Sequence, residues 1–234
     1  MPLTGHRQPT SDAAARAGLW LLPIYGLLLA YSTRTQQPDQ HEQFEAYARY
    51  VTTLEFLLSH LIASIGGAAL AILGVVSAVT FLSRGAGHRP AVTGLVLTVL
   101  SQVLMTSVFG SAAFVQPGIG RAFLAGRSGM PDLNEDTAYG TATLGTAGVS
   151  ILLLIAGAAF LGVVIARTAP ELRWVGIGFG AGLPLFAING FLTVGFPTQP
   201  LFGLLLSGIT VVLARRLPTL APARERPLVS VSGA

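Results

Sequence analysis

The sequence predicts an all-α integral membrane protein, a bundle of six transmembrane helices. Of its 234 residues, 52% are hydrophobic and 10% are charged, whereas about a quarter of the residues in a soluble domain are charged. The hydrophobic residues form six blocks, most of them close to the roughly 20 residues that cross a bilayer core. Arginine lies at the ends of these blocks, as in membrane proteins generally. The predicted spans are 17–32, 54–83, 91–115, 139–166, 174–195 and 201–214.

The six spans predict one membrane domain, residues 17–216, between a cytoplasmic N-terminal segment, 1–16, and a cytoplasmic tail, 217–234. The proline-rich composition of the tail predicts disorder. With both termini inside, ten arginines fall on the cytoplasmic side and four on the other. This bias favours that orientation, and we expect the chain to lie in a bacterial plasma membrane.

The first block has two interpretations. It is short, and Ala30-Tyr31-Ser32 resembles a signal-peptidase site. Pro23 interrupts its apolar run, however, and Trp20 and Tyr25 are typical of interfacial anchors on a helix that stays in the membrane. We favour the retained helix.

The second span carries the strongest pattern. Apolar residues recur at helical spacing from Phe44 to Leu54, which predicts that this helix begins outside the membrane. Deeper in the span, small residues three or four apart predict a stripe for close helix packing. That stripe comprises Gly67, Ala71, Gly74 and Ala78 and is headed by His60.

Between the third and fourth spans, residues 116–138 are expected to form an outer loop. Asp132 and Glu135 in this loop have the spacing of a helix start, which we favour over a cation site. The fifth span contains alternating glycines from Gly176 and then Pro184, which predicts a kinked helix, with packing favoured over a phosphate-binding loop. Phe196 to Pro200 is predicted to be a tight reversal.

Five polar residues within or beside the spans are candidates for a pocket, because polar groups are costly in hydrocarbon. His60 is interpreted either as a hydrogen-bonding residue between helices or as a proton relay or ligand contact, and Glu55 either as an ion-pair partner of Arg34 or Arg121 or as a cavity residue. By depth alone, the candidates would line an outward-facing polar pocket. They are Glu55, His60, Gln102, Thr106 and Asn189.

Several functional classes are disfavoured. The chain has no cysteine, which removes disulfides and thiolate metal sites. Its arginines are spread over block ends rather than gathered in one stripe, so nucleic-acid binding is not expected. No catalytic or cofactor motif is present, and no enzyme activity, cofactor or metal is predicted.

Two functions remain open. The first is binding or transport of a small or lipidic molecule, and a weak echo between residues 65–76 and 155–164 agrees with the repeats of some transporters. Chance recurrence of small residues is the favoured explanation of that echo. The second is a non-catalytic scaffold or subunit with a membrane-protein partner. The lipid bilayer is the expected environment in both.

Overall fold

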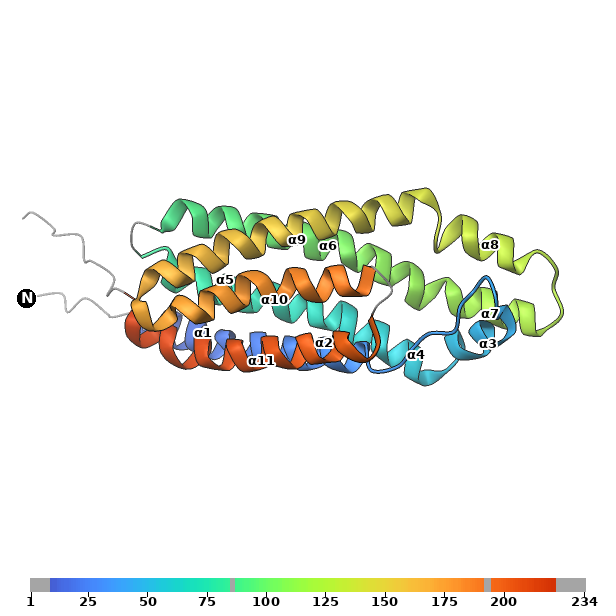
Figure 1. The fold of residues 1–234 in the computed structure, drawn as a ribbon, viewed down its shortest axis with the longest axis horizontal. Coiled ribbons are helices and arrows are strands. Elements are labelled where there is room, and N and C mark those ends of the chain that lie inside the picture. Colours follow the sequence, from blue (N-terminus) through green and yellow to red (C-terminus); the bar gives the residue numbers. More distant parts are fainter. Residues whose placement is uncertain (1–8, 85–86, 192–194, 222–234) are drawn as a thin grey trace, which may run out of the picture.

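The computed structural model describes residues 9–84, 87–191 and 195–221 of the chain, and these residues form an all-helical bundle without strands (Figure 1). Six helical segments among them are long and apolar enough to cross a membrane, which confirms the predicted all-α class and the number of candidate spans. The segments are Asp12–Ser32, Leu54–Leu82, His88–Leu124, Met130–Thr168, Pro170–Gly190 and Thr198–Leu220.

The first span consists of α1 (Pro9–Leu19) and α2 (Leu21–Ser32), which are separated by a turn at Trp20. The helical segment therefore begins earlier than the predicted boundary at residue 17. Pro23 does not interrupt α2 because it lies in the first turn, where a missing backbone N–H costs no intrahelical hydrogen bond.

The predicted extension of the second span is a separate helix rather than a continuation, which corrects the sequence prediction. Helix α3 (Phe44–Val51) ends before Thr52, and α4 (Leu54–Leu58) starts after it. Thr53 has an extended backbone, and its Oγ1 accepts a hydrogen bond from the Phe56 amide at 3.2 Å, so it caps α4. The span continues as a π-helix, η1 (Ser59–Gly66), and then as α5 (Gly67–Leu82).

The third and fourth spans project beyond the others. They are α6 (His88–Phe114) with α7 (Gln116–Leu124), and α8 (Met130–Thr137) with α9 (Thr141–Thr168). At 1.5 Å per residue, α6 and α7 together extend about 55 Å, well beyond a hydrocarbon core of about 30 Å. Figure 1 shows this pair reaching past the ends of α2, α10 and α11.

Residues 116–138, expected to be a loop, are therefore mostly helical in α7 and α8. The turn between these helices uses Gly126 and Gly129, whose φ angles of 83° and 74° are disfavoured for other residues. Gly129 rather than Asp132 occupies the N-cap of α8, and Asp132 lies in its first turn. An acidic residue there still suits the positive end of the helix.

The chain returns through a single 3-10 turn, η2 (Pro170–Leu172), into α10 (Arg173–Phe191) and then α11 (Gly195–Leu220). The predicted reversal from Phe196 to Pro200 is wrong, because these residues already belong to α11, with Pro200 inside the helix. Helix α11 also continues through 217–220, the start of the predicted tail, and 222–234 lie outside the described residues. Pro184 lies inside α10, and the kink there stays a prediction.

Glycines bring the helices of the bundle together. A Cβ atom added at Gly162 of α9 would lie 2.6 Å from the Gly176 carbonyl oxygen and 2.8 Å from the Gly180 Cα of α10. Gly176 and Gly180 of α10 thus face the backbone of α9, whereas Gly178 and Gly182 face Ile209 and Leu206 of α11. A Cβ atom added at Gly26 of α2 would lie 2.6 Å from the Ser207 amide nitrogen of α11. These helices approach with little but backbone between them, as small-residue motifs in membranes allow.

The predicted packing stripe on η1 and α5 faces α2. A Cβ atom added at Gly74 would lie 2.6 Å from the Leu22 side chain, and one at Gly67 would lie 3.4 Å from the Tyr25 ring. Ala71, between these levels, and Ala78, one turn beyond Gly74, are both buried. The stripe therefore lies at a helix contact, and its small residues determine how closely α2 can approach.

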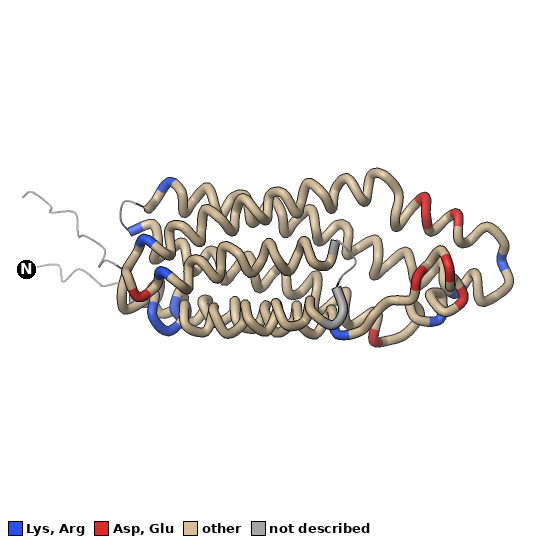
Figure 2. The backbone as a smooth tube through the Cα atoms, in the orientation of Figure 1, with Lys and Arg blue, Asp and Glu red and all other residues tan. Residues whose placement is uncertain are grey.

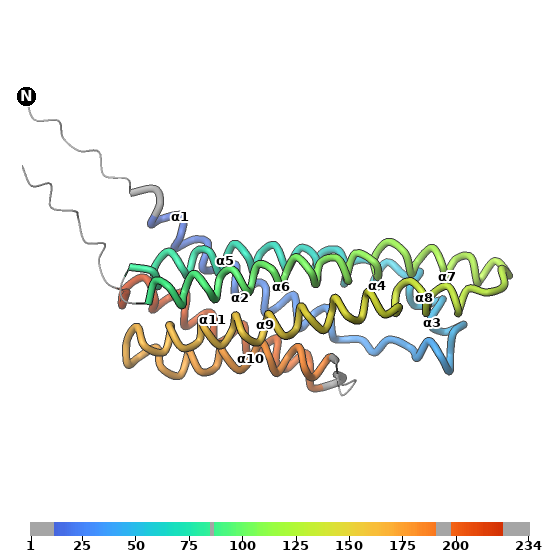
Figure 3. Tube along the Cα trace, turned by 90° about the horizontal axis from the view of Figure 1, so that it is seen from above, coloured from blue at the N-terminus to red at the C-terminus, as the bar shows by residue number. Residues whose placement is uncertain are grey.

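Charge divides the bundle into two ends (Figure 2). Helix α1 begins and α11 finishes at one end, seen in Figures 1 and 3. We call it the arginine end, because among the described residues it carries seven arginines and two carboxylates, Asp12 and Glu171. Its arginines are Arg16, Arg84, Arg89, Arg167, Arg173, Arg215 and Arg216. The opposite end and the segments beyond it hold four arginines and seven carboxylates.

Candidate functional site

Glu55 forms an ion pair. Arg34, just after α2, donates from Nη2 to Glu55 Oε1 at 2.8 Å, and the Arg34 guanidinium also lies over the Tyr31 ring at 4.3 Å. Of the two partners considered from the sequence, Arg34 is the one in contact. The side chains are 50% and 41% exposed, so the pair adds no more than about 1 kcal/mol of stability. It fastens the end of the first span to the start of the second.

His60 is held within its own helix. Its Nδ1 lies 2.8 Å from the Phe56 carbonyl oxygen, which can only accept, so Nδ1 carries the proton. The ring packs against Phe56 with 4.2 Å between centroids and is 6.3 Å from Phe109 of α6. It lies in η1, a π-helix of eight residues. Segments of π-helix are rare in proteins, and those that occur are often found at functional sites. Nothing in the sequence reasoning indicated this irregularity.

Gln102 is buried in the middle of the bundle. Its Nε2 donates to the Tyr25 hydroxyl at 3.4 Å, joining α6 to α2. Both residues line a cavity of only about 10 Å³, the minimum for a single water molecule. Thr106, one turn further along α6, is half-buried. Gln102 therefore acts as a polar contact between helices.

Asn189 lies near the end of α10. Its Oδ1 accepts a hydrogen bond from Thr198 Oγ1 of α11 at 3.1 Å, so it bridges the two helices on either side of residues 192–194. Among the described residues, no hydrogen bond joins any two of the five pocket candidates. Each has neighbours of its own, and a pocket shared by all five stays a prediction.

A small folded unit lies beyond the bundle, opposite the arginine end. We call it the lobe, and it consists of α3, α4, α7, α8 and the segment 37–42. Tyr47, Val51 and Phe56 form its buried centre, and Phe44 meets Phe123 edge to face at 4.8 Å. The apolar face of α3 thus packs on the chain's own helices.

Polar side chains join the parts of the lobe. Asn134 is fully buried, its Oδ1 accepts from the Tyr47 hydroxyl at 3.2 Å, and its Nδ2 donates to Gln40. Gln37 Nε2 donates to the Tyr139 hydroxyl at 2.7 Å. Burial raises the pKa of Tyr47 because the charged phenolate would lose its hydration. The hydrogen bonds of this network therefore join neutral side chains.

Asp39 fixes the turn that leads into the lobe. Its Oδ1 accepts from the backbone amides of His41 at 2.7 Å and Glu42 at 3.1 Å. These hydrogen bonds favour the carboxylate and lower the pKa of Asp39. The turn precedes α3, which begins at Phe44 with Gln43 at its N-cap.

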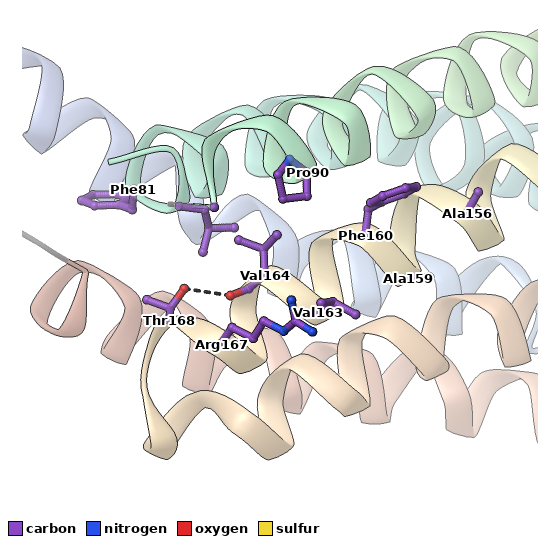
Figure 4. Close-up of a pocket in the computed structure, with 11 residues that line it drawn as sticks. Phe81, Pro90, Ala156, Ala159, Phe160, Val163, Val164, Arg167 and Thr168 are labelled. Carbon is purple, nitrogen blue, oxygen red and sulfur yellow. Dashed lines mark hydrogen bonds between the residues drawn. The ribbon is translucent and has the colours of Figure 1, made fainter. Parts of the chain in front are cut away.

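An apolar groove lies at the arginine end, with a volume of about 630 Å³ (Figure 4). It lies where the end of α5 and the start of α6 face α9, and Arg167 is the charged side chain at its edge. Its lining comprises Phe81, Leu82, Gly87, Pro90, Ala156, Ala159, Phe160, Val163, Val164, Arg167 and Thr168.

Sequence reasoning missed this groove. In the sequence, Arg167 served only to orient the chain across the membrane. The apolar lining residues are indistinguishable from those of any membrane helix. The groove is lined by residues of three helices, which a periodicity in one helix cannot reveal. Helices α6 and α9 are in contact along it, since a Cβ atom added at Gly87 would lie 2.9 Å from Val164 Cγ1 and one added at Gly94 would lie 2.7 Å from the Leu161 side chain.

Comparisons with known proteins do not assign the groove or the lobe to a family. Neither protein-family models, nor curated proteins, nor solved structures gave a match to this chain.

Proposed function

We propose that the protein is a non-catalytic integral membrane protein that binds one lipid molecule in the groove between α5, α6 and α9. The observation that carries this proposal is the groove itself, whose volume of about 630 Å³ lies within the roughly 300–1,000 Å³ of typical ligand pockets. Its lining is almost entirely apolar, with a cation at one edge. A lipid is divided in the same way, into an apolar acyl chain and a polar headgroup.

The position of the groove supports a lipid over a water-soluble ligand. Phe160 and Val163 are 42% and 48% exposed on the surface of α9, within the fourth span. A ligand can therefore enter sideways from the bilayer. The interior offers much less room, because the cavity beside Gln102 has about 10 Å³. We accordingly place the ligand in the groove rather than in the outward-facing pocket expected from the sequence.

We further propose that both termini face the cytoplasm of a bacterial cell, so that the groove opens towards the inner leaflet. The excess of arginine at the end where α1 begins supports this orientation. A reporter fused after Ala234 is then expected to stay inside the cell. Export of that reporter would overturn the orientation.

Lipid binding is tested by filling the groove. In Val163→Trp the indole occupies the space beside Phe160, and we expect the purified protein to lose a phospholipid that the wild type retains, measured by native mass spectrometry. Val149→Trp is the matched control, since Val149 lies on the same helix, is 51% exposed, and is not part of the groove lining. Equal retention of lipid by both variants would contradict the proposal.

A second candidate is a partner subunit that docks through the lobe. The observation that favours it is the exposed apolar surface of the lobe and its neighbourhood, with Leu54 and Phe114 each 68% exposed and Leu133 43% exposed. A single cysteine at Leu133 would then give a cross-linked product of one defined mass in native membranes. A ladder of products, or none, would contradict this candidate.

A further inference from the structure

We propose that the groove selects an anionic phospholipid, with the phosphate at Arg167 and an acyl chain along Phe160 and Val163. The inference rests on the proposed function, which requires only that a lipid binds, and adds the chemical class of its headgroup. Four observations support it. Arg167 has no partner among the described residues, Arg84 is already paired with Asp12, the apolar wall extends along α9 below Arg167, and the first turn of α6 borders the groove.

Arg167 has a charge available for a ligand. It is exposed in the last turn of α9, and it forms no hydrogen bond or ion pair with any described residue. In Figure 4 it lies between Thr168 and Val163 at the edge of the groove. The hydroxyl of Thr168 is already engaged, because it donates to the Val164 carbonyl oxygen at 2.9 Å. The guanidinium is thus the group best placed to hold a phosphate, which it can bind with two parallel N–H donors.

Arg84 has a different role at the opposite wall. Its Nη2 donates to Asp12 at 2.7 Å, its side chain is 10% exposed, and its guanidinium lies over the Phe81 ring at 4.5 Å. The charge is balanced by Asp12, and the stacking holds Phe81, which lines the groove. Arg84 therefore shapes the wall, and Arg167 is left to bind the ligand.

The distances along α9 match an amphiphilic ligand. Phe160 precedes Arg167 by seven residues, so it lies about 10 Å deeper along the helix axis. A phosphate at Arg167 would thus lie at the end of the span while the chain beneath it lies against Val163 and Phe160. A free phosphate would use none of this apolar wall.

The start of α6 adds to the attraction for an anion. Gly87, the N-cap residue of α6, and Pro90 in its first turn both line the groove. The first turn of a helix carries a partial positive charge. With Arg89 also exposed at this end, the surroundings disfavour the cationic choline group of a zwitterionic lipid, and basic pockets between helices on this side typically bind anionic headgroups.

The test compares two lipids that differ only in their headgroups. The purified full-length protein is titrated with dioleoyl phosphatidylglycerol and dioleoyl phosphatidylcholine, and binding is measured by native mass spectrometry. We expect the wild type to prefer phosphatidylglycerol about fivefold, the ratio expected for one nearby arginine. In Arg167→Gln that ratio should fall to about one, while a lipid is still bound. Arg173→Gln removes an equal charge at the same end without touching the groove, and should keep the preference.

Each outcome separates the two proposals. If the wild type binds both lipids equally, or Arg167→Gln keeps the preference, the anionic headgroup site is wrong and lipid binding stands. If Val163→Trp keeps both lipids, the groove is not the binding site and both proposals fail. If millimolar inorganic phosphate displaces phosphatidylglycerol, the site recognises phosphate alone and the acyl-chain part is wrong. Unchanged elution volumes of the variants would establish that they are folded.

Discussion

The bundle and the lobe are stabilised in opposite ways. In the bundle, helices approach through glycines, as Gly162 does against Gly176 and Gly180, around a buried apolar core. In the lobe, aromatic rings surround Tyr47, and the side chains of Asn134 and Gln40 complete a buried hydrogen-bond network, as in a soluble protein. Burial of apolar surface from water drives the second kind of packing but not the first, because lipid is as apolar as leucine. Substitutions in the two regions should therefore lower the stability of the protein for different reasons.

The largest effect is expected from Gly162→Val. Its Cβ would overlap the backbone of α10, which cannot move aside as a flexible side chain could, so α9 and α10 must separate. We expect a loss of about 3 kcal/mol, at the upper end of overpacking costs, measured by reversible unfolding in detergent. Gly145→Val, on the same helix with nothing within 4 Å of its Cβ position, is the control. Similar unfolding of the two variants would show that close backbone packing does not hold the bundle.

A smaller and more local effect is expected from Asn134→Leu. The change leaves the buried Tyr47 hydroxyl without its acceptor, which costs about 2 kcal/mol. Hydrogen exchange should then accelerate in α3 and α8 but not in α10. The double variant with Tyr47→Phe removes the stranded hydroxyl as well and should recover part of the loss. Faster hydrogen exchange throughout the bundle would contradict the separate stabilisation of the bundle and the lobe.

The smallest effect concerns pH and the turn at Asp39. Because the folded pKa of Asp39 is lowered, its carboxylate stabilises the turn above the ordinary value of 3.8, and this contribution is lost as the pH falls through the folded pKa. We expect the amides of His41 and Glu42 to lose protection on acidification below about pH 4. In Asp39→Ala protection should already be low at neutral pH and respond little to acid. A wild-type turn that is insensitive to acid would refute this assignment.

The spans could be predicted because a bilayer imposes a length and a composition on each of them. All six predicted blocks overlap the helical segments of the structure, although α1 begins earlier and α11 includes the expected reversal. The lobe could not be predicted in the same way. Helices α7 and α8 have only nine and eight residues, too few to be stable alone, and they depend on contacts such as that of Gly120 with Val51 of α3.

The pocket candidates show the same limit. Sequence identified Glu55, Gln102 and Asn189 as polar exceptions, but not the partners that hold them, since Arg34, Tyr25 and Thr198 come from other segments. The groove has almost no polar residues to attract notice. Its lining comes from α5, the start of α6 and α9 together, so the groove is a property of the assembled bundle.

The length of α9 has a mechanical consequence. With 28 residues it extends about 42 Å, from the lobe to the arginine end. A stiff rod of that length that pivots by about 5° at its centre moves each end by about 2 Å in opposite directions. Because one wall of the groove is α9 itself, any force on the lobe that tilts this helix also changes the width of the lipid site.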